Sequence, residues 1–186
     1  MLEYKVGNTQ ALEEIFKRYK KPMLNYAFKL LRNFADAEDV VSEVFYVVTA
    51  QKDKYIPEAK FSTWLFTIAH NICIDRLRKK RNIFSLWQKK DKDTETYEEW
   101  DIPDTKFMPN VAVESRDVSK YVKNAIDKLP FISREAIILR EYHNLSYEEI
   151  SKVLHCSINK VKVLIFRARE KLRAQLLPLL KEAGNV

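Results

Sequence analysis

The chain has 186 residues, which is enough for one or two domains with a hydrophobic core. It contains only two glycines, Gly7 and Gly184, so the glycine-rich phosphate loops of nucleotide-binding enzymes and the GxSxG nucleophile turn are absent. Tight β-hairpins also depend on glycine, so an all-β fold is disfavoured. The net charge of +7 favours a nucleic acid or another anionic partner.

The cysteines and the hydrophobic stretches indicate where the protein works. Two cysteines, Cys73 and Cys156, are too few for the disulfide framework of a small secreted domain. The first 14 residues lack the apolar core of a signal peptide. The longest uncharged stretch, residues 61–74, is shorter than the roughly 20 apolar residues of a membrane span. The sequence therefore predicts a cytoplasmic protein.

Charge divides the chain into three segments. Residues 1–82 carry a net charge of +5, residues 83–115 carry −4, and residues 116–186 carry +6. The acidic segment holds two prolines and little hydrophobic periodicity, which is typical of a linker. We therefore predict an all-α protein with two small helical domains, 1–82 and 116–186, joined by an acidic flexible linker, 83–115. Whether Trp87 and Trp100 of this linker are buried stays open.

The first segment shows the periodicity of three helices. In the first, Ala11, Ile15 and Tyr19 recur at helical spacing until Pro22 interrupts the pattern, which then resumes. Asp36 has the place of an N-cap for a second helix, and Ser62 for a third. The second helix is expected to bury Val40, Val41, Val44, Phe45 and Val48, and the third Leu65, Ile68, Ala69, Ile72 and Leu77.

The third predicted helix and the loop before it carry a pattern suited to nucleic acid. Residues 76–81 hold five cations in six positions, more than the capping of a helix C-terminus requires. Four aromatic residues alternate with lysines just upstream, as in surfaces that stack unpaired bases along a charged track: Tyr55, Phe61, Trp64 and Phe66. Core packing is the competing interpretation, and we expect it for Phe66 and for at least one of Phe61 and Trp64.

The third segment has the layout of a helix-turn-helix. An amphipathic helix ends before Pro130, and Ser133 has the place of a cap for the next one. Ser146 and Glu149 form a capping box for a short helix, a turn follows at residues 155–157, and Ser157 caps a long final helix. An ordinary α-hairpin is the alternative. The final helix is expected to bury Ile158, Val161, Ile165, Ala168 and Leu172.

Catalytic and metal-binding patterns are missing from the sequence. His70 and Cys73 share a helix face, but the further ligands of a zinc site cannot be assembled, so a buried cysteine beside a helical histidine is the better interpretation. No nucleophile, base and orienting group occur together. We therefore predict a protein that is not an enzyme and has no metal, no cofactor and no small-molecule substrate.

Two long runs of the sequence resemble one protein family. The run YAFKLLRNFADAEDVVSEVF, the following loop and KFSTWLFTIAHNICIDRLRKKR are similar to the second conserved region of bacterial sigma factors. The run from LPFISREAIILREYHNLSYEEISKVLHC to SINKVKVLIFRAREKLRAQL resembles their fourth region. The similarity is greatest to the extracytoplasmic-function (ECF, group IV) class of the sigma-70 family, and it spans roughly residues 8–82 and 116–177.

This resemblance implies three sets of site residues. The set that docks on the clamp of core RNA polymerase is Glu38, Asp39, Val41, Ser42, Glu43 and Phe45. The set that captures and holds the minus-ten strand is Lys54, Lys60, Phe61, Trp64, Asn71, Arg76, Arg78 and Lys79. The set that reads the minus-thirty-five element in the major groove is Ser157, Asn159, Lys160, Lys162, Val163, Phe166 and Arg167.

The sequence departs from the family pattern at several of these positions. Ser42 stands where the family usually has glutamine, which weakens a polar contact with the polymerase. His155 stands where glycine is usual, at a turn position compatible with a positive φ. In the reading helix the usual Gly-Thr and Ser-Arg are replaced, so Val163 and Phe166 are candidates to pack on thymine methyl groups. We therefore expect an A·T-leaning upstream element.

The resemblance implies an alternative sigma factor that binds the clamp and flap regions of core RNA polymerase, recognises two promoter elements and helps to melt the minus-ten element. The linker's acidity fits a path through the polymerase channel that later carries RNA. Many relatives are held inactive by an anti-sigma factor, and the sequence leaves open whether this one is. Two rivals are a free-standing helix-turn-helix regulator and a helical adaptor with no role at DNA.

Overall fold

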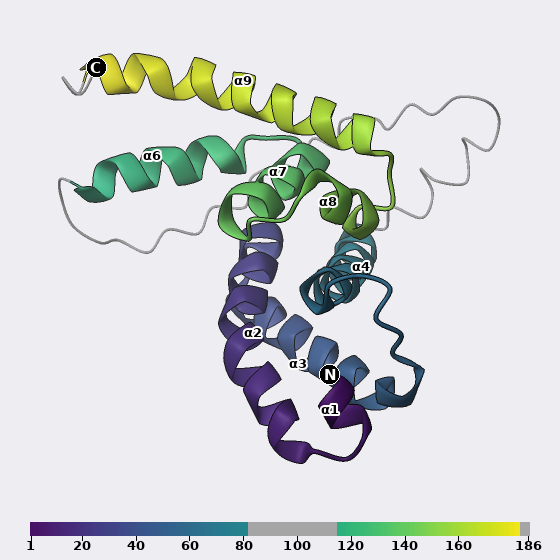
Figure 1. The fold of residues 1–186 in the computed structure, drawn as a ribbon. Coiled ribbons are helices and arrows are strands. Elements are labelled where there is room, and N and C mark those ends of the chain that lie inside the picture. The colour runs from purple at the N-terminus through teal and green to yellow at the C-terminus, as the bar shows by residue number, and fades with distance from the viewer. Residues whose placement is uncertain (82–114, 183–186) are drawn as a thin grey trace. The chain divides into compact units, whose positions relative to one another are not determined.

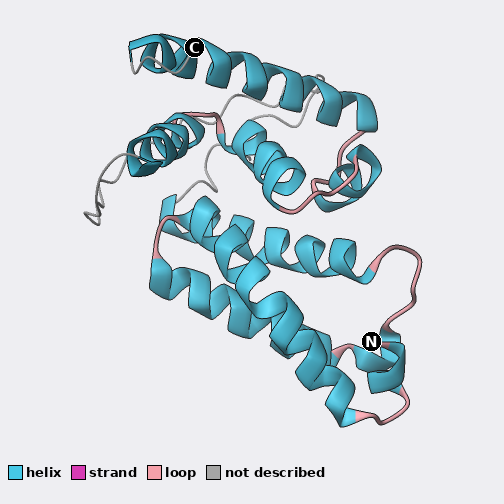
Figure 2. Ribbon diagram, turned by 60° about the vertical axis from the view of Figure 1, so that its left-hand side comes forward, coloured by secondary structure: helices cyan, strands magenta, loops and turns pink. Residues whose placement is uncertain are grey.

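A computed structural model describes residues 1–81 and 115–182. These residues form helices joined by turns and loops, and no strand occurs among them (Figure 2). The prediction of an all-α fold is confirmed. The predicted linker, with Trp87 and Trp100, lies outside the described residues, and the assignment of 1–82, 83–115 and 116–186 as domains stays a prediction.

The described helices fall into two compact units, which are treated separately. The first unit contains α1 to α4 and the segment Glu148–His155, and the second contains the remaining helices (Figure 1). The helices of the N-terminal half are α1 (Leu2–Lys5), α2 (Thr9–Leu31), α3 (Phe34–Ala50), η1 (Lys52–Lys54) and α4 (Phe61–Arg81). Those of the C-terminal half are α6 (Ser115–Asp127), α7 (Phe131–Ile137), η2 (Ile138–Tyr142), α8 (Tyr147–Val153) and α9 (Ile158–Glu182).

Helix α2 is longer than the sequence pattern predicts. Asn8 caps it by accepting hydrogen bonds from the backbone N–H groups of Gln10 at 3.1 Å and Ala11 at 3.3 Å. The helix continues through Pro22, so the predicted interruption there is wrong. Proline removes one helical hydrogen bond, but packing of both halves of α2 outweighs that loss, since Ile15, Met23 and Tyr26 are all buried.

Two predicted N-caps in the first unit are also wrong. Asn33 caps α3, because its side-chain Oδ1 accepts from the N–H of Asp36 at 3.0 Å and leaves Asp36 inside the first turn. Helix α4 begins at Phe61, so Ser62 lies within it. The N–H of Trp64 already donates to the carbonyl of Lys60 at 3.3 Å, which closes the first turn without a serine cap.

Helices α2, α3 and α4 pack on one another to form the core of the first unit. The rings of Tyr26 and Phe66 meet edge to face with centroids 5.2 Å apart. All five predicted core residues of α3 are buried, as are Leu65 and Ala69 of α4. The other predicted positions of α4, at 68, 72 and 77, are only half-buried. The expected burial of Phe66 is confirmed, whereas Phe61 and Trp64 are both half-buried.

The second unit is built on α6, α7 and α9, with α9 packing on both of the others. Its core includes Ile126, Ile137 and Ile165. Helix α7 begins at Phe131, and the N–H of Arg134 donates to the carbonyl of Pro130 at 2.8 Å. The predicted cap at Ser133 is therefore wrong, because this residue lies buried inside the first turn.

The short helix, the turn and the long helix occur in the order that the sequence predicts. Helix α8 ends at Val153 and α9 begins at Ile158. Ser157 caps α9, since its Oγ accepts from the N–H of Lys160 at 3.3 Å. In the turn between them, His155 has a φ of +50°, which confirms the left-handed backbone expected at this position.

Candidate polymerase and nucleic-acid interfaces

One side of α3 presents an acidic surface to solvent. Glu38, Asp39, Ser42 and Glu43 are exposed, whereas Val41 and Phe45 are buried in the core of the first unit. Four of the six predicted polymerase contacts therefore share an accessible surface. Val41 and Phe45 lie on the inward side of the same helix and pack in the core. This split follows helical periodicity, because positions 41 and 45 are one turn apart on the inward face.

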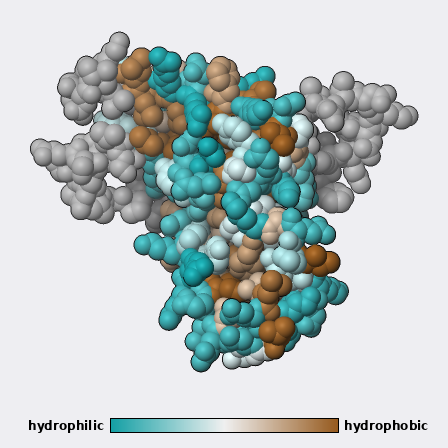
Figure 3. All heavy atoms as spheres, in the orientation of Figure 1, coloured by the Kyte–Doolittle hydropathy of each residue, from teal (hydrophilic) through white to brown (hydrophobic). Residues whose placement is uncertain are grey.

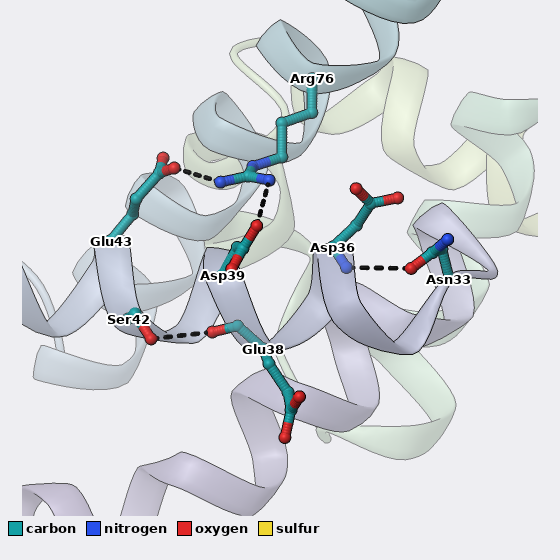
Figure 4. Close-up of polar contacts among 7 residues, drawn as sticks. All are labelled: Asn33, Asp36, Glu38, Asp39, Ser42, Glu43 and Arg76. Atoms are coloured by element: carbon teal, nitrogen blue, oxygen red, sulfur yellow. Dashed lines mark hydrogen bonds and ion pairs between the residues drawn. The ribbon is translucent and has the colours of Figure 1, made fainter.

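Ser42 lies on this surface with its hydroxyl already engaged. Its Oγ donates to the backbone carbonyl of Glu38 at 3.0 Å, one turn earlier in the helix (Figure 4). A glutamine, which is usual here in the family that the sequence resembles, would reach further from the helix. The charge of the acidic surface of α3 comes from Glu38, Asp39 and Glu43, and Ser42 adds none.

Arg76 of α4 joins two carboxylates of this surface (Figure 4). Its Nη1 lies 3.2 Å from Oδ2 of Asp39, and its Nη2 donates to Oε1 of Glu43. Burial by itself lowers the pKa of Arg76, but the hydrogen bonds with Glu43 and Asp39 outweigh it, so the pKa is raised overall. The sequence assigned Arg76 to one interface and the carboxylates to another, and the structure brings the three together.

An apolar groove beside the acidic surface was missed by the sequence reasoning. It has a volume of about 430 Å³ and is lined by Leu12, Glu13, Phe16 and Lys17 of α2 and by Phe45 and Thr49 of α3. The rings of Phe16 and Phe45 meet there at 4.7 Å between centroids. Only the partial exposure of Phe16 marks the groove, and exposure cannot be obtained from a sequence pattern.

Four aromatic side chains form a cluster at the start of α4. Phe61 and Trp64 lie 5.7 Å apart between ring centroids, and Tyr55 of the preceding loop lies 5.8 Å from Phe61 and 5.0 Å from Trp64. Tyr19 of α2 completes the cluster at 5.5 Å from Phe61. Burial, together with the neighbouring Tyr19, raises the pKa of Tyr55. The sequence predicted the cluster except for Tyr19, which comes from a distant segment.

Polar and cationic candidates surround this cluster and continue along α4. Lys54 and Lys60 are exposed on the loop, and Asn71 and Lys79 are exposed on the helix. Arg78 is exposed too, and its Nη1 lies 3.4 Å from Oδ1 of Asp75. An exposed pair of this kind is weak, so a phosphate can replace the carboxylate. Of the predicted strand-holding cations on α4, Arg76 alone joins two carboxylates of α3 among the described residues.

Helix α9 separates its candidate DNA contacts from its core residues. Val161, Ile165 and Ala168 are buried as predicted, whereas Leu172 is half-buried. Ile158 is exposed, so its predicted burial is wrong. Five candidates are exposed at positions that share the opposite stripe of the helix: Asn159, Lys162, Val163, Phe166 and Arg167. Two of them, Val163 and Phe166, are large apolar side chains with exposed fractions of 47% and 66%. Ser157 is exposed and Lys160 half-buried at the start of the helix.

Arg169 and Cys156 flank this stripe without belonging to it. Nη2 of Arg169 lies 2.7 Å from Oε1 of Glu141, and this hydrogen bond raises the pKa of Arg169. Burial is the main cause that raises the pKa of the Cys156 thiol, with Glu135 adding to the effect and Lys160 opposing it. Neither group is therefore arranged as a reactive centre.

The described ranges hold neither a metal-binding cluster nor a membrane-spanning helix. Among residues 1–81 and 115–182, no three acidic, histidine or cysteine side chains come together in a way that could hold a metal ion. Within the same ranges, no helix combines the length and the apolar character needed to cross a membrane. His70 and Cys73 are both buried in the first unit, as the sequence predicted.

Both halves of the chain match known protein families. Residues 15–83 match Sigma-70 region 2, and residues 119–172 match Sigma-70, region 4. The first match spans α3, the aromatic cluster and α4. The second spans α7, α8 and most of α9.

Relatives match over nearly the whole chain. The ECF RNA polymerase sigma factor SigW of Bacillus subtilis is 34% identical over 175 residues, which cover 94% of this chain and 93% of the relative. The RNA polymerase sigma-H factor of Pseudomonas aeruginosa is 29% identical over 177 residues, 95% of this chain and 92% of the relative. The ECF RNA polymerase sigma-E factor of Escherichia coli K12 is 28% identical over 175 residues, 94% of this chain and 91% of the relative.

Solved structures agree with these relatives. CnrH, in complex with the cytosolic domain of CnrY, matches with a TM-score of 0.64 at 25% identity, over 92% of this chain and 91% of that one. The sigma factor RpoE of Bartonella quintana, in complex with the anti-sigma factor NepR, shares the fold with a TM-score of 0.65 at 22% identity, over 90% of this chain and 97% of that one. With two matched regions in the family's order and a relative above 30% identity, the chain belongs to the ECF class of the sigma-70 family and is an alternative sigma factor, which recognises promoters together with RNA polymerase.

Proposed function

We propose that this sigma factor divides promoter recognition between its two halves. The acidic surface of α3 docks on the polymerase clamp, the aromatic cluster and the cations of α4 hold the minus-ten strand, and the exposed stripe of α9 reads the minus-thirty-five element. The domains 1–82 and 116–186 then act as separate binding modules joined by residues 83–115. The exposed stripe of α9 is the observation that carries this proposal furthest.

The stripe on α9 supports base reading in the major groove. A helix that enters this groove needs a continuous outward row of side chains and a buried row that fixes it to its domain. Asn159 and Lys162 can bond to base edges or phosphates, and Val163 and Phe166 can meet thymine methyl groups. Both apolar side chains are exposed, and contact with DNA would remove part of their surface from water.

The cluster at the start of α4 supports capture of unpaired bases. Phe61 and Trp64 are half-buried, so each ring is held by its neighbours while part of its surface is accessible. A base leaving the duplex loses stacking, and an aromatic surface restores part of it. Lys54 and Lys60 are exposed nearby to neutralise the phosphates of the same strand. No catalytic group is required for this task.

The acidic surface of α3 supports docking on a basic partner surface. Its exposed carboxylates, Glu38, Asp39 and Glu43, lie within two turns of one helix. Such a patch accelerates association with a cationic surface and fixes its register. The proposal places the protein in the cytoplasm, because that is where core RNA polymerase transcribes. The anti-sigma complex of the related fold from Bartonella quintana makes an anti-sigma factor a further candidate partner.

Transcription with purified core polymerase tests the proposal. Genomic fragments of the source organism serve as templates, and start sites are mapped with and without the protein. New starts that share an upstream and a downstream element are expected. A protein that binds duplex DNA by itself but neither binds the polymerase nor changes its starts would instead be a free-standing regulator.

A steep fall in promoter binding with added salt is expected of the holoenzyme, because phosphate contacts release counterions. A promoter affinity that does not respond to salt would favour a helical adaptor with no role at DNA.

A further inference from the structure

We infer that Arg76 is a positioning residue of the polymerase-docking surface and not a contact to the minus-ten strand. This inference rests on the proposed function of α3. It reassigns the one member of the predicted strand-holding set that joins two carboxylates of α3 (Figure 4).

Asp39 and Glu43 need a positive neighbour to hold their arrangement. They are four residues apart on α3, so their side chains are adjacent on the helix surface and repel each other. The guanidinium of Arg76 offers two N–H groups in a fixed plane, and each carboxylate receives one of them. The repulsion is thereby replaced by two charge-assisted hydrogen bonds that fix both side chains.

The exposure of the three side chains shows which of them face a partner. The Arg76 side chain is 21% exposed, whereas Asp39 is 66% exposed and Glu43 is 51% exposed. The contacts described for Arg76 use Oδ2 of Asp39 and Oε1 of Glu43, so the second oxygen of each carboxylate can accept from a partner. The group of three keeps a net charge of −1 and still attracts a cationic surface.

The same geometry makes Arg76 a poor phosphate ligand. To reach a phosphate it would have to leave two carboxylates, at the cost of two charge-assisted hydrogen bonds and of an unshielded pair of like charges. Nη1 of Arg78, two residues later, lies 3.4 Å from Oδ1 of Asp75, an exposed carboxylate on the same helix. Arg78 is therefore the matched control, since it has the same side chain, lies on the same helix and belongs to the set expected to hold the strand.

Two binding measurements separate the roles. The affinity of each variant for core polymerase is measured first, and then the affinity of saturated holoenzyme for a minus-ten single strand. Arg76→Ala is expected to bind polymerase about tenfold more weakly and to change strand affinity by less than about twofold. Arg78→Ala is expected to keep its polymerase affinity and to weaken strand binding, with a smaller salt slope.

Two further variants exclude a general effect on folding or charge. Arg76→Lys keeps the charge but lacks the planar pair of Nη groups that meet the two carboxylates separately, so it should lose part of the polymerase affinity that Arg76→Ala loses. In a background of Asp39→Asn and Glu43→Gln, Arg76→Ala should cause little additional loss. Helix content by circular dichroism shows that each variant is folded.

Three results would overturn the inference. One is normal polymerase affinity of Arg76→Ala together with weaker strand binding. A second is full rescue of polymerase affinity by Arg76→Lys, and the third is additivity in the double-mutant cycle. Failure of the wild-type protein to bind core polymerase at all is a different result, because it would overturn the proposed function and the inference with it.

Discussion

Helices α4 and α9 both carry candidate DNA contacts, but they present them differently. On α9 the candidates form one exposed stripe opposite one buried stripe, so each residue has a single role. On α4 the candidates divide among a half-buried aromatic cluster, a bridge to α3 and an exposed basic end. Where a helix has one buried and one exposed stripe, the hydrophobic periodicity of its sequence is enough to assign its residues. Where a helix also contacts other helices through polar side chains, its residues can be assigned only from the tertiary contacts.

The largest expected effect is on the free energy of unfolding, and it tests whether α9 has one buried and one exposed stripe. Ile165 has an exposed fraction of 1% and Phe166 one of 66%, although they are adjacent in sequence. Ile165→Ala should lower the free energy of unfolding by about 2–5 kcal/mol, because it leaves a cavity in the core. Phe166→Ala should change it by less than about 0.5 kcal/mol. Urea denaturation followed by circular dichroism measures both, and equal losses would contradict the division.

Trp64→Ala tests whether the aromatic cluster of α4 acts on DNA in addition to packing. Loss of one stacking surface should reduce open-complex formation about tenfold, because stacking on an aromatic ring contributes about 1–3 kcal/mol per base. Trp64→Tyr keeps an aromatic surface and should retain most of the activity. The fluorescence of 2-aminopurine placed in the minus-ten element reports the opening. If both variants opened the promoter like the wild type, the cluster would have a packing role only.

Lys162→Ala tests the exposed stripe of α9 for phosphate or base contact. The variant should use the promoter several-fold less well at moderate salt, and its salt slope should fall by about one. Its affinity for core polymerase should not change. Lys152→Ala is the control, because Lys152 is an exposed lysine of α8 outside the proposed contact set. A loss of polymerase binding by Lys162→Ala would contradict the assignment of α9.

A smaller effect is expected on the base preference of the holoenzyme at the upstream promoter element. If Val163 and Phe166 pack on thymine methyl groups, sequences selected from a random pool by the holoenzyme should be rich in A·T at the upstream site. Phe166→Ala should then relax the preference at one position by about 1 kcal/mol, which corresponds to roughly fivefold in the ratio of bound sequences. Strong G·C enrichment at the upstream site would contradict this assignment.

Figure 3 shows how hydrophilic and apolar side chains are distributed over one face of the molecule. On the face it displays, hydrophilic side chains cover most of the described surface and apolar ones gather in patches between them. Periodicity predicted the buried positions of α3 and three of the five predicted for α9. The candidate contacts of α9 came from the family resemblance. Periodicity could not reveal the contact of Arg76 with Asp39 and Glu43, because these residues are 37 and 33 positions apart.

Several predicted helix starts are wrong for a related reason. Asp36, Ser62 and Ser133 are residue types that favour N-caps, yet each lies inside a helix. In α3 a nearby Asn33 takes the capping role, and in α4 and α7 the backbone closes the first turn without a side-chain cap from these serines. At Pro22 the packing of the whole helix outweighs the local preference. Local propensity therefore predicted the helices but misplaced the starts of α3, α4 and α7, whereas the cap of α9 at Ser157 lies where it was predicted.

The smallest expected effect is on the reactivity of the two free thiols, and each thiol reports on one unit. Cys73 is fully buried in α4, whereas Cys156 is half-buried in the turn before α9. Because burial raises the pKa of Cys156 above the ordinary 9.0, its reaction with a disulfide reagent should reach half its maximal rate above pH 9. The native state keeps this proton longer than the unfolded chain does. The free energy of unfolding should therefore fall as the pH rises above about 9, and Cys156→Ser should remove that part of the fall. Cys73 should react only when the first unit opens, and therefore more slowly than Cys156. Equal labelling rates of the two thiols would contradict the burial assigned to Cys73.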